Sequence, residues 1–181
     1  HLKLRASYGL IGSDETGSAA GHFLYMDNVT LQDNAMDYTT GEDLSNTKRG
    51  PNLKGRAIRN AVWEKALKFD FGIDAELFSG LSIVADYFYD KRYDILMQRK
   101  AWPQGLGYDE AKPWANIGKI DNWGFELSAN YNKAITKDLQ MELRANFTYT
   151  QNKNVDIDEP LYVYPWQSDT GLPMTVTRGY I

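Results

Sequence analysis

The residues of this chain that could take part in chemistry are carboxylates, loop aromatics and two histidines, while cysteine is absent. Without thiols the chain cannot form disulfides, thiolate-bound zinc sites, iron–sulfur clusters or a catalytic cysteine. His1 and His22 stand alone, because a Ser-His-Asp triad or a metal site needs further side chains that no motif here supplies. No pair of carboxylates stands apart as an acid–base couple. We therefore expect no catalytic residues and no enzyme.

Acidic side chains gather in two segments, which contain the candidate calcium ligands Asp33, Asp37, Asp156 and Asp158. Carboxylate oxygens are the ligands that calcium prefers. Neither segment has the Asp-x-Asp-x-Asp-Gly and Glu spacing of an EF-hand loop. The expectation is therefore an acidic loop with no metal and no other cofactor, and a structural Ca²⁺ ion is the alternative.

Aromatic side chains next to prolines occupy two segments in which polar and apolar residues do not alternate. They are Trp102, Tyr108 and Trp114 in the first segment, and Tyr162, Tyr164 and Trp166 in the second. Exposed rings form stacking platforms for sugars or anchors for a partner protein. We predict substrate or partner contacts here, and the alternative is that the rings pack the loops against one another.

The elements that must position these residues are strands, because four segments alternate between apolar and polar residues: 66–77, 81–90, 123–132 and 139–150. Every odd-numbered position in them is apolar or aromatic, and the only such residues at even-numbered positions are Ala66, Val84 and Phe88. Residues two apart lie on the same face of a strand but on different faces of a helix. The opening residues, 1–9, alternate in the same way, which gives about five long strands.

This alternation fits either a soluble β-sandwich or a transmembrane β-barrel. Three features favour the barrel. The strands are ten residues or longer, as membrane strands must be. Short turns (79–80 and 133–138) alternate with long connections (10–62 and 95–116), as periplasmic turns alternate with extracellular loops in outer-membrane barrels. Thirdly, aromatics lie near the strand ends and small aliphatics near the middle.

The strand-end aromatics are candidates for the two membrane girdles, where an apolar ring with a polar tip is most stable. They are Trp63, Tyr87, Tyr89, Trp123, Tyr131 and Tyr149. The fold class is therefore all-β, a partial antiparallel transmembrane barrel. Because five strands cannot close a barrel and an open edge in lipid is not viable, further strands are expected outside this sequence.

Composition excludes two further classes. The 20 basic and 24 acidic residues give a formal net charge of −4, and no basic block is present, so we expect no nucleic-acid binding. No apolar run reaches the ~18 residues of a membrane helix. The first residues resemble neither a signal peptide nor a chain start and begin within strand-like sequence, and the last residues, 175–181, end without a closing signal. We therefore expect residues 1–181 to be an internal piece of a longer chain.

Five stretches together resemble the SusC/RagA-type TonB-dependent transporters. Residues 2–12 (LKLRASYGLIG) are similar to the family phrase LRASYGxxGN. Residues 50–53 together with 63–74 are similar to the phrase NPxLxWEKxxxxxxGxD. Residues 86–96, 116–127 and 146–153 are similar to the phrases DYYxKxxxDLL, NxGxxxNxGxExxL and NFTYxxNK. One departure is residues 54–61 (KGRAIRNA), which separate Pro51-Asn52-Leu53 from Trp63-Glu64, whereas the family usually joins them closely.

The resemblance implies a large outer-membrane barrel of the 22-strand kind, filled by an N-terminal plug, with this chain in the C-terminal half of the barrel. Such proteins import glycans or peptides with energy delivered by TonB, and a SusD-like surface lipoprotein closes the top. The implied partners are thus the lipoprotein lid, TonB through the missing plug region, an oligosaccharide or peptide substrate, and outer-membrane lipid. A soluble carbohydrate-binding sandwich and a plain porin or adhesin barrel are the alternatives.

Overall fold

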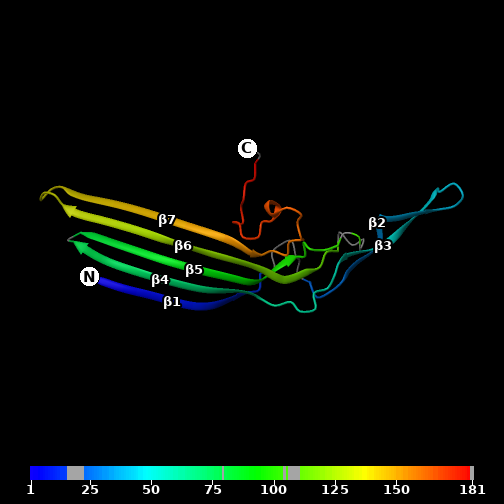
Figure 1. Ribbon diagram of the computed structural model, residues 1–181, viewed down its shortest axis with the longest axis horizontal. Coiled ribbons are helices and arrows are strands. Elements are labelled where there is room, and N and C mark those ends of the chain that lie inside the picture. Colours follow the sequence, from blue (N-terminus) through cyan, green and yellow to red (C-terminus); the bar gives the residue numbers. More distant parts are fainter. Residues whose placement is uncertain (16–22, 79, 104, 106–110, 180–181) are drawn as a thin grey trace.

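The computed structural model describes residues 1–15, 23–78, 80–103, 105 and 111–179. Within these ranges the chain forms seven strands in two sheets and one 3-10 turn, η2 (Pro165–Gln167). The larger sheet has the order β1-β4-β5-β6-β7 with antiparallel neighbours (Figure 1). Its strands are β1 (Leu2–Ser13), β4 (Glu64–Phe78), β5 (Leu81–Gln98), β6 (Trp114–Ala134) and β7 (Gln140–Asp156). The five predicted long strands are confirmed.

The strand register gathers the predicted apolar positions on one face of this sheet. One row across all five strands consists of Ala6, Phe71, Tyr87, Phe125 and Tyr149, each opposite the next. The Phe125 and Tyr149 rings lie 5.5 Å apart between centroids. Since side chains alternate along a strand, most charged and amide side chains of the alternating segments occupy the other face.

The apolar face is not covered by another layer. Phe147 is 54 % exposed and Leu143 is 58 % exposed, and the buried apolar residues of the described ranges are only Ile58, Ala111 and Ile157. A soluble sandwich would bury this face against a second sheet, and the described residues form no such sheet over it. Over the described ranges, no helix has both the length and the apolar character needed to cross a membrane.

Short and long connections lie at opposite ends of the sheet, as predicted. Figure 1 shows β4 and β6 ending, and β5 and β7 beginning, at the same end as the N-terminus, whereas β1 and β5 end, and β6 begins, toward the other. Gly80 in the β4–β5 turn has φ 96°, and a Cβ atom there would lie 1.8 Å from the Asn132 carbonyl oxygen. The tight turn therefore requires glycine.

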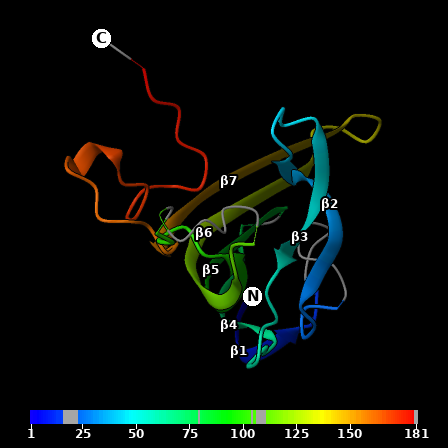
Figure 2. The same cartoon turned by 90° about the vertical axis from the view of Figure 1, so that its right-hand side faces the viewer.

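The prediction of one long connection without strands over residues 10–62 is wrong. β1 continues to Ser13, and β2 (Asn28–Thr40) and β3 (Asn46–Gly55) form an antiparallel hairpin. The hairpin projects beyond the long-connection end of the larger sheet (Figures 1 and 2). Its pairing shifts register three times, and each shift breaks the two-residue alternation by which strands are detected in sequence. The second long connection is also shorter than predicted, because β5 extends to Gln98 and β6 begins at Trp114.

Phe88, an exception to the alternation, covers a glycine on the polar face. Phe88 and Gly124 are cross-strand partners, and a Cβ atom on Gly124 would lie 2.7 Å from Cζ of the Phe88 ring. It would also lie 2.3 Å from the carbonyl oxygen of Tyr149. The aromatic ring thus fills the space that the missing side chain leaves, a known way to stabilise glycine in sheets.

Candidate functional site at the long-connection end

The polar face of the sheet is held together by ion pairs between strands. The Arg5 guanidinium of β1 donates to Asp74 Oδ1 (Nη2, 2.8 Å; Nε, 3.1 Å) and to Asp86 Oδ1 (Nη2, 2.8 Å). Arg5 therefore connects β1, β4 and β5. Gly72 opposite Arg5 leaves the space, since a Cβ atom there would lie 2.8 Å from Nη2 of Arg5 and 2.3 Å from Asp86 Oδ1.

Nearer the long connections, a second charged group lines a depression of about 470 Å³. Arg92 lies 3.6 Å from Glu64 and 3.2 Å from Asp90, and Lys68 Nζ lies 3.7 Å from Asp90 Oδ2. Glu64, Lys68 and Arg92 form part of the lining, together with Ile11. Charges of both signs with exposed polar atoms can exchange hydrogen bonds with a hydrated solute. Because the lining also includes Ile11 and Leu96, the depression offers both charged and apolar surface to a ligand.

Asp158 joins the β5–β6 connection to the segment after β7. Its Oδ2 accepts hydrogen bonds from Arg99 Nε (2.8 Å), Lys100 N (2.8 Å) and Ala101 N (3.2 Å). Burial raises the pKa of this carboxyl, but the Arg99 hydrogen bond and the two backbone N–H groups outweigh burial and lower it. Asp158 is thus an ionised contact between two loops that are distant in sequence.

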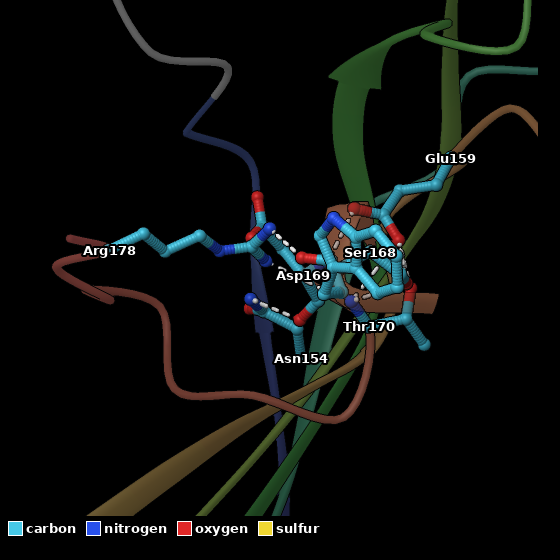
Figure 3. A network of polar contacts seen from close by, with 7 residues as sticks. Asn154, Glu159, Ser168, Asp169, Thr170 and Arg178 are labelled. Atoms are coloured by element: carbon cyan, nitrogen blue, oxygen red, sulfur yellow. Dashed lines mark hydrogen bonds and ion pairs between the residues drawn. The ribbon is translucent and has the colours of Figure 1, made fainter. Parts of the chain in front are cut away.

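Glu159 orders the segment after β7 (Figure 3). Its carboxylate accepts hydrogen bonds from Ser168 Oγ (2.5 Å), Asp169 N (2.7 Å), Thr170 Oγ1 (2.8 Å) and Thr170 N (3.1 Å). Burial raises the pKa of Glu159, but these donors together outweigh burial and lower the pKa to about 2. The ionised carboxylate therefore closes the loop by accepting four hydrogen bonds from residues 168–170.

The same loop is tied back to the end of β7 and to Arg178. Asn154 Nδ2 donates to the Asp169 carbonyl oxygen (3.3 Å), and Gly171 N donates to the Asn154 carbonyl oxygen (2.7 Å). Arg178 donates to the Ser168 carbonyl oxygen (2.8 Å), to the Trp166 carbonyl oxygen and to Asp169 Oδ1. Figure 3 shows Arg178 reaching Asp169 from the side opposite Glu159. These contacts give the loop a defined shape.

Two of the predicted loop aromatics come together on this loop. The Tyr164 and Trp166 rings stack with centroids 4.4 Å apart and an interplanar angle of 12°. Trp166 is 69 % exposed and Tyr164 is 50 % exposed, and Tyr162 beside them is also exposed. A parallel pair leaves the outer ring faces open to solvent, so Tyr164 and Trp166 form an exposed aromatic platform.

The other predicted loop aromatics are placed differently. Trp102 and Trp114 are half-buried. Trp114 is the first residue of β6 and not a loop residue, because the strand begins earlier than predicted. Among ring pairs in the described parts of the chain, none joins either residue to the platform. Tyr108 lies outside the described residues.

The predicted girdle residues occupy the two ends of the apolar face. Tyr89 is opposite Trp123, in the row next to that of Tyr87 and Tyr149, and the Trp123 and Tyr149 rings lie 5.9 Å apart. Trp63 is exposed just before β4. Tyr131 pairs with Leu81 at the short-turn end. These positions agree with two girdles, whose contact with a membrane stays a prediction.

Three of the four candidate calcium ligands, Asp33, Asp156 and Asp158, form ion pairs with basic side chains. Asp33 lies 2.6 Å from Lys54 Nζ and accepts from Ala35 N (2.9 Å), and the Lys54 contact is the main reason that its pKa is lowered to about 2. Asp156 lies 3.7 Å from Lys119 Nζ. Asp37 lies in β2. Across the part of the chain that the structure describes, no three metal-binding side chains converge, and calcium binding stays an untested alternative.

Sequence reasoning missed the organising role of Glu159, Arg178 and Asn154. Glu159 was visible only as part of an acidic run, and its partners lie nine to eleven residues further along. The Ser168–Gly171 stretch (SDTG) is a turn-forming sequence, and it was the one available signal that a closed loop follows β7.

Comparison with known proteins agrees with this architecture. Residues 1–177 match the family described as TonB dependent receptor-like, beta-barrel. The chain is 27 % identical over 152 residues to the TonB-dependent receptor SusC of Bacteroides thetaiotaomicron, and 26 % identical over 156 residues to the TonB-dependent receptor P39 of Formosa agariphila. These alignments cover 84 % and 86 % of this chain but 14 % of each relative, so the chain spans about a seventh of their length.

Solved structures of a transporter complex also resemble this chain. The structure of the RagAB peptide transporter matches with a TM-score of 0.64 and 26 % identity, over 91 % of this chain and 17 % of that one. RagAB in its open-open state, described as a peptide importer, matches with a TM-score of 0.64 and 25 % identity.

Proposed function

We propose a function from one premise: this chain belongs to the TonB-dependent receptor-like β-barrel family, and within it to the SusC/RagA type. We propose that its strands form part of the wall of an outer-membrane importer and that its long connections form part of the extracellular mouth. The plug and the remaining strands are then supplied by the rest of the full-length transporter. Transport and not catalysis is the activity.

One observation carries this proposal: the large sheet has an uncovered apolar face and an opposite face crossed by ion pairs. Phe147 and Leu143 on the apolar face are mostly exposed, which suits contact with lipid. Arg5 with its two aspartates lies on the other face, where charged groups are stable only against water or a polar plug. The short turns accordingly face the periplasm.

The substrate that we propose is an oligosaccharide or a peptide. The Tyr164–Trp166 platform lies at the extracellular end in this orientation, where its open ring faces suit sugar rings or aromatic side chains. SusC and the RagAB peptide transporter are of the same family type. By analogy, a SusD-like lipoprotein covers the mouth, and TonB acts through the plug.

Cell fractionation tests the membrane assignment. The full-length transporter is expected in the outer-membrane fraction and in detergent micelles, with gel mobility that changes on heating. Recovery as a monodisperse protein without detergent would exclude the barrel wall.

Substitution of the platform tests the extracellular site. Replacing both Tyr164 and Trp166 with alanine should weaken substrate binding about tenfold, because each aromatic stacking contact contributes roughly 0.5–1.5 kcal/mol. Val163 is the matched control, since it lies between them and is 84 % exposed without a ring. Equal binding by the double variant and by Val163→Ala would remove the platform from the substrate path, while leaving the barrel assignment intact.

A further inference from the structure

On the apolar face of the larger sheet, which faces outward in the proposed barrel, a row of aromatic side chains is followed directly by a row of charged side chains. Lys91 of β5, Asp121 of β6 and Lys153 of β7 are successive cross-strand partners. They lie two residues beyond Tyr89 and Trp123 on the same strands, and therefore on the same outward face. The charged side chains therefore lie directly beyond the aromatic row, toward the long-connection end of the sheet.

The charges in this row are not balanced. At the same end of the sheet, Lys65 lies 2.9 Å from Asp94 and Lys119 lies 3.7 Å from Asp156. Lys91 and Lys153 are exposed, and neither has an ion pair within 4 Å among the residues that the structure describes. With Asp121 as the one carboxylate between them, the row has an excess of one positive charge.

Asp121 is fixed in place by the aromatic row. Tyr89 donates its hydroxyl to Asp121 Oδ2 at 3.0 Å, and Asp121 Oδ1 is buried without a hydrogen-bond partner in the described residues. A Cβ atom on Gly171 would lie at an ordinary contact distance, 3.9 Å, from the Lys153 Cε atom, so the loop after β7 runs beside the lysine stem. Lys91 and Lys153 lie on either side of β6, so their backbones are two strand spacings apart, about 9.6 Å. Their long side chains can both reach an anion that lies outside the row, beyond Asp121.

We propose that Lys91 and Lys153 bind a phosphate group of a glycolipid in the outer leaflet of the membrane. This site rests on the proposed function, because only a barrel wall presents the row to lipid. Aromatic girdles lie at the level of the lipid headgroups, and lysines at the end of an apolar span extend toward that level. The row thus meets the membrane where lipid phosphates are located. The contact would hold the outer rim of the barrel to the lipid around it.

Lipid retention by the full-length transporter tests the site. The protein is purified from outer membranes in mild detergent, and bound glycolipid is quantified by native mass spectrometry. Since each lysine near a charged lipid surface contributes about fivefold to affinity, K91Q/K153Q should lower retention at least tenfold. K91R/K153R keeps both charges and should retain the lipid. K133Q is the matched control, because Lys133 is an exposed residue of β6 on the same face at the short-turn end.

Binding to delipidated wild-type protein separates the sources of phosphate. A phosphorylated glycolipid should bind, whereas the same glycolipid after enzymatic dephosphorylation should not. Unchanged retention in K91Q/K153Q, equal binding of the two glycolipids, or occupancy by inorganic phosphate alone would each overturn the proposal. Absence of the wild-type protein from the outer membrane would instead overturn the proposed function, and fractionation before lipid analysis detects that separately.

Discussion

Replacement of Gly124 by alanine tests whether the strands pack on the polar face as described. The new Cβ atom would lie 2.3 Å from the Tyr149 carbonyl oxygen and 2.7 Å from Cζ of Phe88. Contacts under 3.0 Å are essentially never adopted by real Cβ atoms, so β6 and β7 would have to separate by about 0.7 Å or the Phe88 ring and the ladder would have to shift. Overpacking of this kind costs about 1–3 kcal/mol.

Gly9 is the matched control, because it lies on the polar face of β1 and no atom lies within 4 Å of its added Cβ. Alanine there should increase stability by about 0.5 kcal/mol, since glycine in a strand has the larger entropy cost on folding. We therefore expect Gly124→Ala to be about 2 kcal/mol less stable than Gly9→Ala in the full-length transporter.

The assay is urea unfolding in detergent micelles, followed by the loss of the compact, unheated gel band. The double variant with Phe88→Ala separates the two obstacles, because it removes the ring and leaves the Tyr149 carbonyl oxygen in place. Equal stability of Gly124→Ala and Gly9→Ala would refute the close approach of β6 and β7 at this position. Full rescue by Phe88→Ala would assign the whole cost to the ring.

Three further predictions concern the loops. Glu159→Gln should speed hydrogen exchange of the Asp169 and Thr170 amides, which mass spectrometry measures, because the variant loses the charged acceptor of both N–H groups. In the wild type the pKa of Glu159 is lowered, so the loop is fully ordered above about pH 4.5 and loses its order as the pH falls toward about 2. Trp fluorescence should follow this loss of order. Arg99→Leu should expose the segment after β7 to limited proteolysis, since it removes a donor to Asp158; an unchanged cleavage pattern would show that the contact does not join the loops. Lys54→Met should raise the pKa of Asp33 from about 2 toward 3.8, as an NMR titration would show, and an unaltered titration would exclude the pairing.

The larger sheet was predictable because each of its strands has one apolar and one polar face. That pattern is local, so Leu143 and Phe147 can be assigned to a face without knowledge of any partner. The exception at Phe88 is explained by Gly124 on the next strand, which the Phe88 ring covers. Recognising this pair requires the strand register, which the local pattern does not provide.

The β2–β3 hairpin and the closed loop after β7 were not predictable in the same way. The hairpin pairs through register shifts between Thr30 and Asp33 and between Asp33 and Tyr38, so its faces do not follow a two-residue period. The loop depends on one carboxylate, Glu159, that meets donors contributed by Ser168 and its neighbours. Such contacts depend on the path of the chain, which composition and spacing do not determine.

The hairpin has a consequence for the order in which the sheet assembles. β4–β5 and β6–β7 are joined by short turns, so these pairs can form early with little loss of chain entropy. β1 must instead find β4 across the roughly 50 residues that separate Ser13 from Glu64. By holding Asn28 opposite Gly55, a hairpin formed beforehand removes about half of that loop, and each halving lowers the closure cost by about 0.6 kcal/mol. If the hairpin forms first, it therefore shortens the search of β1 for its partner β4.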